Sequence, residues 1–558
     1  MCLLRSWLCL LALLVSMAVA GLADSWGPQS RAVALYSGAE AAGSTLALQD
    51  AFRSLGIPYR TVTLLQDALS AHLLFVCGDV ESNDAASEYE RILRPYVENG
   101  GVVVFENVTA GALGKLAGFA SAVPLRTRHL LKFSTSVLPD STASLGSPDS
   151  PEVIWSVGYS PAGADVLAQF EDGSAALLRH KVGEGFVYTI GTGWMDTILR
   201  PRQNRDFEAQ RVYVNALDSS TDLFLLALQD LYWKHTPKAC RLSSLPRDAL
   251  GLVILTHDID WEYSLVPAQS FVRAEKQRGI RATYFVQAKT HGDYNGPPIL
   301  TTGAKTRLAA MLREGADLES HSVSHSLWFN QMPAGTGEER SPTYAPMAKD
   351  FRTIIGATVS GEVCVSKQRL DAAFSRKVII FRAGHLRVPP TLPETLETCG
   401  YVADSSFTAA DVMTSLPYRL NKTLGFEEPT RIFEFPVTVE DEQWRLERHT
   451  EDVLKLVRVQ GMIGAPTTVL IHPTNAAGKL RAETRILEAL PPDVPVSDLR
   501  TYANFYIARW NLDWSDDRDG DLRLCSRDGI AGLTLKTKQA DQVVDIPSGE
   551  CRLLSTPQ

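Results

Sequence analysis

The sequence has little that would suit a nucleic-acid-binding or metal-thiolate protein. Its formal charge is −9 over 558 residues, so basic side chains are not in excess for binding a phosphate backbone, and we expect no nucleic acid partner. None of its cysteines forms a CxxC pair, which argues against a zinc finger or a thioredoxin-type site. It has no long-period repeat and no low-complexity tract. These absences leave an ordinary folded protein as the expectation.

Long hydrophobic runs are also missing beyond the first twenty residues. That opening segment has one positive charge at Arg5, an apolar run to Val15, and small residues at Ala18 and Ala20. The pattern is typical of a secretory signal peptide over residues 1–20. An uncleaved anchor is the alternative, although the run is short for a bilayer span of ~20 residues. We therefore expect a secreted or periplasmic protein without stable membrane insertion.

Cleavage of the signal peptide would leave six cysteines in a compartment that permits disulfides. Cys525 and Cys551 bracket a strand-rich tail, so we predict that they pair. Cys364 with Cys399 is the second pairing that we predict.

A chain of this length is too long for one hydrophobic core, and we expect two or three domains. In residues 28–235, apolar strands at 32–36, 73–76 and 102–105 alternate with helical segments. Such alternation predicts a parallel sheet wrapped by helices. The region resembles the Rossmann-like α/β domain of class I glutamine amidotransferase relatives. Its Cys77 lacks the Gly-x-Cys-x-Gly elbow of the active enzymes, so we interpret it as a buried cysteine of a non-catalytic module.

The remaining chain divides into three parts. Residues 236–250 are polar and contain proline, as in a linker. A second series of strands and helices follows over 251–510, and short alternating runs over 511–558 predict a small β-rich tail.

Two acids follow the apolar strand 252–256, namely Asp258 and Asp260. Side chains alternate along an extended chain, so both can project to the same side at the carboxyl end of the strand. In α/β folds that end carries the chemistry. Taken alone, the same acids could cap a helix or lie in a solvated loop.

Two histidines follow the helical segment 306–314, namely His321 and His325. Four residues apart, they share one face if the segment is helical, and in a tight loop they can still meet one metal ion. Capping or surface histidines are the alternative.

Three later segments are FRAGH with Arg382, GYVADSSF with Asp404, and TVLIHP with His472. Together with THDID and HSVSH, they resemble, in the same order, the motifs of the NodB-homology polysaccharide deacetylases, which are family-four carbohydrate esterases. The resemblance covers roughly residues 250–500 and implies a distorted (β/α) barrel. Two positions depart from the pattern: Ile259 separates the two aspartates, and His385 replaces the usual proline-aromatic ending.

The resemblance implies a metal-dependent site. Its ligands would be Asp260, His321 and His325, and the divalent ion would be zinc, with cobalt or nickel as alternatives. The implied catalytic residues are Asp258 as the base, Arg382 as the partner of that carboxylate, His472 as the acid, and Asp404 as the carboxylate that orients His472. His257 is left out of the ligand set, because the family has an aromatic residue there.

The expected function is removal of N-acetyl groups from an acetylated hexosamine polysaccharide, either an exopolysaccharide or a cell-wall polymer. A small amide or an O-acetylated polymer is an alternative substrate. A carbohydrate-binding or assembly protein with a decayed deacetylase domain is the alternative from another class. Decay usually removes a ligand or the acid, and here all of them are present.

Overall fold

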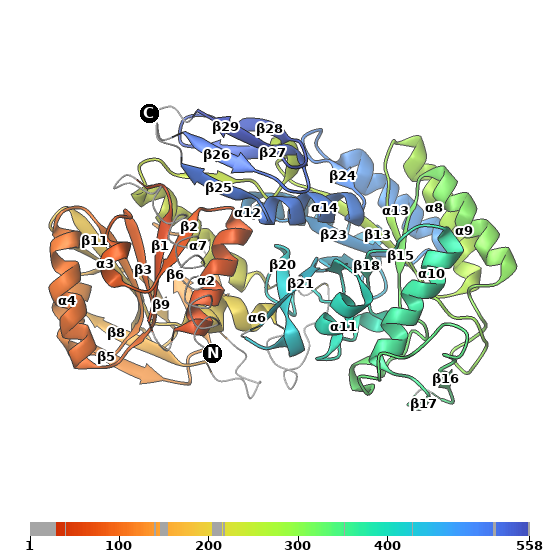
Figure 1. Cartoon of the computed structure of the whole chain (residues 1–558), viewed down its shortest axis with the longest axis horizontal. Coiled ribbons are helices and arrows are strands. Elements are labelled where there is room, and N and C mark those ends of the chain that lie inside the picture. Colours follow the sequence, from red (N-terminus) through yellow and green to blue (C-terminus); the bar gives the residue numbers. More distant parts are fainter. Residues whose placement is uncertain are drawn as a thin grey trace, which may run out of the picture.

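The computed structural model contains two α/β units and a smaller β-unit that lies along both of them (Figure 1). The predicted signal peptide lies outside the residues that the structure describes. Within the described residues, no helix is long and apolar enough to cross a membrane. The structure describes residues 30–38, 41–138, 141–145, 154–203, 215, 218–350, 352–426, 428–516 and 521–555.

An eleven-stranded sheet organises the amino-terminal unit. In spatial order its main path is β2 (Tyr59–Val62), β1 (Val33–Ser37), β3 (Leu73–Val80), β4 (Val102–Val108), β11 (Gly185–Ile190), β10 (Ala175–Val182), β9 (Asp165–Phe170), β6 (Leu130–Phe133) and β7 (Thr142–Ser144), with β5 (Phe119–Leu125) and β8 (Ser156–Pro161) beside it. The strands from β2 to β11 pair in parallel, and those from β11 to β7 pair antiparallel. The three strands predicted from the sequence correspond to β1, β3 and β4.

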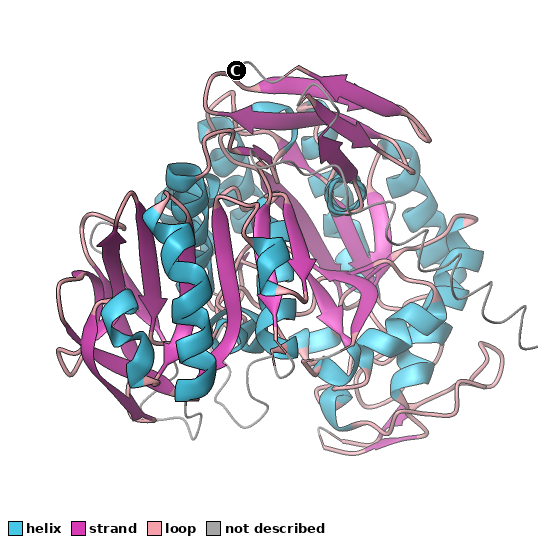
Figure 2. Cartoon of the chain, turned by 60° about the vertical axis from the view of Figure 1, so that its left-hand side comes forward, coloured by secondary structure: helices cyan, strands magenta, loops and turns pink. Residues whose placement is uncertain are grey.

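Helices cover the amino-terminal sheet, as the left of Figure 2 shows. They are α2 (Ala42–Leu55), α3 (Leu65–Ala68), α4 (Asn83–Glu98), α5 (Gly114–Ala117), α6 (Arg200–Arg202) and α7 (Ser220–His235). Apolar side chains of the sheet pack against them in two separate clusters, so the central strands are buried. The amidotransferase-like nature of this unit stays a prediction.

Cys77 lies near the end of β3 and is buried. Burial, together with the nearby carboxylate of Glu106, raises the pKa of its thiol to about 12. A thiol with that pKa is protonated at neutral pH and is a poor nucleophile, in agreement with the predicted buried cysteine.

A second sheet, of ten strands, curls into a half-barrel. Its path is β20 (Tyr418–Asn421), β21 (Pro429–Glu434), β19 (Ala403–Asp404), β18 (Ile380–Phe381), β15 (Asp317–Ser320), β14 (Thr283–Val286), β13 (Val253–Ile259), β23 (Thr467–Ile471) and β22 (Val439–Glu440), and β24 (Val496–Ser497) pairs with β13. All these pairings are parallel except that of β20 with β21. A parallel sheet needs both faces covered, and β13 is buried throughout.

The helices of this second unit are α8 (Leu265–Gln277), α9 (Thr302–Glu314), α10 (Ser366–Phe374), α11 (Leu392–Cys399), α12 (Thr450–Ile463), α13 (Ala476–Ala489) and α14 (Leu499–Trp510). The strands β16 (Met347–Ala348) and β17 (Ile354–Ile355) form a separate short ladder. A disulfide between Cys364 and Cys399 joins the segment before α10 to the end of α11, as predicted.

The carboxyl-terminal tail forms two three-stranded sheets. One contains β12 (Cys240–Leu242), β27 (Ile530–Thr537) and β28 (Gln542–Ile546), and the other contains β25 (Asp513–Asp516), β26 (Leu522–Cys525) and β29 (Cys551–Leu554). The predicted Cys525–Cys551 disulfide joins β26 to β29. The predicted linker therefore contributes a strand, β12, to the tail.

The two α/β units contact each other directly. Arg509 of α14 donates hydrogen bonds to backbone carbonyls of Ser54 and Leu242. Thr414 Oγ1 and the Ser415 amide, which lie between β19 and β20 of the second unit, donate hydrogen bonds to the buried carboxylate of Asp222 in α7. The amino-terminal unit is thus packed against the segment that joins β19 to β20.

Candidate metal centre and active site

The predicted site residues lie at the carboxyl ends of parallel strands that neighbour one another in the half-barrel. Because these strands share one direction, their carboxyl ends meet at one edge of the sheet. Asp258 lies in β13 and Asp260 directly after it, His321 follows β15, Arg382 follows β18, and His472 follows β23.

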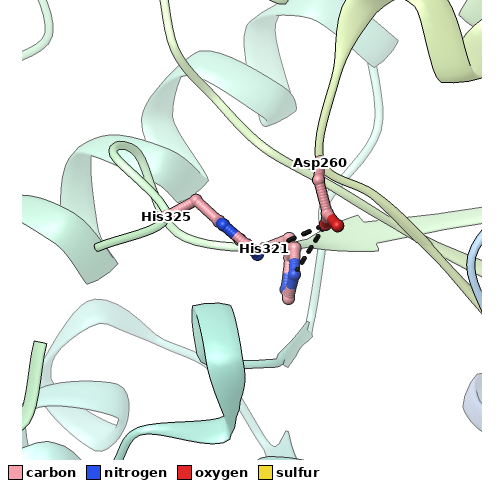
Figure 3. Close-up of side chains that lie close together, drawn as sticks. All are labelled: Asp260, His321 and His325. Atoms are coloured by element: carbon pink, nitrogen blue, oxygen red, sulfur yellow. Dashed lines mark ion pairs between the residues drawn. The ribbon is translucent and has the colours of Figure 1, made fainter. Parts of the chain in front are cut away.

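Asp260, His321 and His325 come together as a group that could hold a metal ion (Figure 3). Oδ1 of Asp260 lies 3.3 Å from Nε2 of His321 and 3.3 Å from Nε2 of His325. This buried oxygen has no hydrogen-bond partner within the described part of the chain. Nδ1 of His321 donates a hydrogen bond to the Arg382 carbonyl at 3.0 Å. Nε2 is therefore the ring nitrogen of His321 that can bind a metal ion. One carboxylate and two imidazoles suit a zinc-like ion.

The two histidines lie on a tight loop, which is the second of the two geometries that their spacing allowed. Ser322 and His325 both have positive φ angles, of 61° and 51°. The buried carboxylate of Glu362 accepts hydrogen bonds from the amides of Val323 and Ser324, at 3.0 and 2.7 Å. Glu362 thereby holds the loop in a conformation that side chains rarely adopt.

Gly384 lies directly against His325. A Cβ atom on Gly384 would come within 2.7 Å of Cδ2 and 2.9 Å of Cα of His325. Because the Cα atom belongs to the strained loop, the backbone must shift if a methyl group is added.

We expect Gly384→Ala to weaken zinc binding by ~10–100-fold, the range typical of losing a residue that orients a ligand. Titration of the metal-free protein with zinc measures this. Gly111→Ala is the matched control, because nothing lies within 4 Å of its added Cβ. Wild-type affinity in Gly384→Ala would show that His325 is not held by this contact.

Arg382 forms a buried ion pair with Asp258. Its Nη1 lies 2.9 Å from Oδ1 of Asp258, while Nε and Nη2 donate to the carbonyl and hydroxyl oxygens of Ser405. The guanidinium carbon also lies 4.1 Å from the ring centroid of Phe285. The other oxygen of Asp258 lies 3.7 Å from Nε2 of His321. Asp258 is therefore held in one orientation beside the candidate ligands.

His472 is held by Asp441. Its Nδ1 lies 2.8 Å from Oδ1 of Asp441, and its Nε2 faces Oδ2 of Asp260 at 3.6 Å. Lys479 Nζ lies 2.5 Å from the other oxygen of Asp441. Burial acts to lower the pKa of His472, but the hydrogen bond with Asp441 and the charges of Asp260 and Asp441 outweigh it and raise the pKa to about 10.

Among the described residues, Asp404 has no hydrogen bond to His472. The carboxylate that pairs with His472 is that of Asp441, and not that of Asp404 as predicted from the sequence. β19, which carries Asp404, is separated from β23 by β18, β15, β14 and β13, whereas β22 is the direct neighbour of β23. Oδ1 of Asp404 instead accepts a hydrogen bond from Ser406 Oγ at 2.6 Å, and Ser406 Oγ accepts one from the Ala383 amide. Burial raises the pKa of Asp404 to about 7. Asp404 thus supports the backbone next to Arg382.

Asp441 is the residue that sequence reasoning missed. It directly follows β22, a strand of two residues preceded by Pro436. An acid at the end of a strand is the same signal that singled out Asp258, but here no apolar run marks the strand.

His385 packs against the candidate ligand His325, whereas His257 pairs with Glu275. The ring centroid of His385 is 4.2 Å from that of His325, and the residue as a whole is exposed. Nε2 of His257 lies 2.9 Å from Oε1 of Glu275, away from Asp260.

Residues 251–403 match the family model described as polysaccharide deacetylase. No curated protein matches the chain. Among solved structures, the carbohydrate deacetylase Agd3 is 12% identical, with 94% of this chain and 99% of that chain covered and a TM-score of 0.39. A family 4 carbohydrate esterase from Streptomyces lividans is 17% identical, with 45% and 92% covered and a TM-score of 0.29.

Proposed function

We propose that the unit built on this polysaccharide deacetylase domain is a metal-dependent hydrolase that removes N-acetyl groups from an acetylated hexosamine polysaccharide. The observation that carries the proposal is the buried oxygen of Asp260, which has no hydrogen bond within the described residues and lies 3.3 Å from both His321 and His325. Those three residues would hold the ion. The proposed ion is zinc, with cobalt or nickel as alternatives, since carboxylate and imidazole ligands suit all three.

A bound divalent ion supplies a Lewis acid that lowers the pKa of water and polarises the acetyl carbonyl. Asp258 is proposed to accept the proton of the attacking water through the oxygen that faces His321. Its other oxygen is occupied by Arg382, at 2.9 Å. That ion pair fixes the direction of the carboxylate.

His472 is proposed to deliver a proton to the leaving nitrogen. An amine departs poorly as an anion, so a positioned acid is typically worth ~10²–10⁴ in rate. Asp441 binds Nδ1 of His472 at 2.8 Å, which leaves Nε2 to face the cluster and carry the transferred proton.

The polymer substrate and the secreted location are proposed together. Two disulfides, Cys364–Cys399 and Cys525–Cys551, fit an oxidising compartment. The signal-like residues 1–20 agree with such a destination. Polysaccharides outside the cell membrane are accessible there.

Acetate release across a panel of substrates tests the function. The panel contains partially N-acetylated polymers of glucosamine and of galactosamine, an O-acetylated xylan and a small acetamide. We expect release from at least one N-acetylated polymer and little from the other two substrates. Release from the xylan alone would make an O-acetylated polymer the substrate, and release from the acetamide alone would make it a small amide. No release from any substrate would favour a binding protein.

Asp441→Asn should lower kcat by ~10–100-fold without loss of zinc, because His472 would lose the carboxylate that orients it. Asp404→Asn is the comparison, since it tests the partner predicted from the sequence. Steady-state kinetics with elemental analysis measures both variants. A large loss of kcat in Asp404→Asn with a normal Asp441→Asn enzyme would return the orienting role to Asp404.

A further inference from the structure

A second group of potential metal ligands lies behind the catalytic strand. It comprises His257 in β13, Glu275 in α8 and Glu483 in α13, and each of these residues is at most 2% exposed. Nε2 of His257 lies 2.9 Å from Oε1 of Glu275 and 3.6 Å from Oε2 of Glu483. These separations bracket the 3.3 Å between Asp260 and each of its two histidines.

The three side chains are surrounded by aromatic rings, and Arg278 is the cation whose charge acts on Glu483. The ring of His257 stacks on Tyr284 at 4.5 Å and packs against Phe271 at 5.0 Å. Glu275 accepts hydrogen bonds from the Tyr284 hydroxyl. Both carboxylate oxygens of Glu483 lack any hydrogen-bond partner among the described residues. A buried carboxylate without hydrogen bonds is costly, and a second carboxylate nearby makes it more so.

Protonation of Glu483 would not satisfy the hydrogen-bonding groups of this cluster. Burial and the charge of Glu275 raise the pKa of Glu483 well above its ordinary value, while the charge of Arg278 acts against them. A protonated carboxyl, however, has an O–H group that needs an acceptor. Glu483 has no hydrogen bond to Glu275 or to any other described residue. The acid form would therefore still leave a buried polar group unsatisfied.

We propose that His257, Glu275 and Glu483 bind a second divalent cation, separate from the ion at Asp260. A divalent ion neutralises the two carboxylates and uses the free oxygens of Glu483 as ligands. One imidazole and two carboxylates are a donor set for zinc or a similar transition ion. Because all three ligands are buried, the site is closed and structural.

The position of this site would let the ion link a strand to two helices. His257 immediately precedes Asp258, and its two partners lie on different helices, α8 and α13. The ion would tie β13 to both helices from behind. It would thereby hold the strand from which Asp258 and Asp260 project.

Zinc content per chain tests the proposal on the full-length protein. We expect about two zinc ions in the wild type and about one in His321→Ala/His325→Ala, because that variant keeps the second site. Glu483→Leu should likewise keep about one. Glu488→Leu is the matched control on the same helix, because the Glu488 side chain is 62% exposed, and it should keep both.

The direction of the change in Tm of Glu483→Leu is a second test, independent of zinc content. If zinc binds there, the variant loses a ligand and its Tm falls, and Glu483→Gln behaves likewise. If no ion binds, replacing an unpartnered buried carboxylate by an apolar side chain raises Tm and leaves the zinc content unchanged. That result, or no zinc in His321→Ala/His325→Ala, overturns the proposal. Neither readout depends on acetate release, so failure of the proposed function remains distinguishable.

Discussion

His472→Gln should lower kcat by ~10²–10⁴-fold and leave the zinc content unchanged. Nε2 of His472 faces Oδ2 of Asp260 at 3.6 Å, whereas the two candidate ligand histidines lie 3.3 Å from Oδ1 of the same carboxylate. The residue is therefore placed to act on the substrate and is outside the proposed ligand set. Initial rates of acetate release and elemental analysis measure the two expectations separately.

The matched control for this variant is His449→Gln. His449 is a half-exposed histidine whose Nδ1 pairs with Asp452 at 3.0 Å, and its loss should leave kcat near the wild-type value. A His472→Gln enzyme with wild-type kcat would remove His472 from the mechanism. Loss of zinc in His472→Gln would make it a ligand instead.

Asp258→Asn and Asp260→Asn should separate catalysis from metal binding. Asp258 bonds with Arg382, so its amide variant should retain zinc and lose ~10²–10⁴ in kcat, because the water loses its proton acceptor. Asp260 faces both histidines, so its amide variant should lose more than the ~10–100-fold in zinc affinity that removal of a supporting residue costs.

Zinc titration of the two variants, followed by kinetics at saturating zinc, measures this pair of expectations. Loss of zinc in Asp258→Asn together with retention in Asp260→Asn would exchange the two roles. The sequence leaves that division open, since Ile259 separates the two aspartates.

The sequence predicts the site best where functional side chains follow apolar strands. The run before Asp258 and the run before His472 each predict a buried strand, and β13 and β23 are neighbours in the sheet. The parallel direction of the strands then brings their carboxyl ends together without further information. The proximity of Asp258 and Asp260 to His321 is a consequence of the same topology.

Sequence reasoning was weakest for contacts that depend on strand order. Asp404 ends a strand of two residues and Asp441 directly follows another, and only the order of strands in the sheet shows which of them reaches His472. In the same way, β12 is not recognised as a strand within the predicted linker, because the strand with which it pairs, β27, is far away in the chain. Pairings between distant segments leave no local pattern of hydrophobic residues to read.

Acetate release by chelator-treated enzyme, before and after zinc is added back, tests the central claim most directly. With a partially N-acetylated glucosamine or galactosamine polymer as substrate, we predict that chelation abolishes release and that zinc restores it in the wild type. His321→Ala/His325→Ala should stay inactive at the same zinc concentration. Undiminished release after complete removal of the metal would contradict the account.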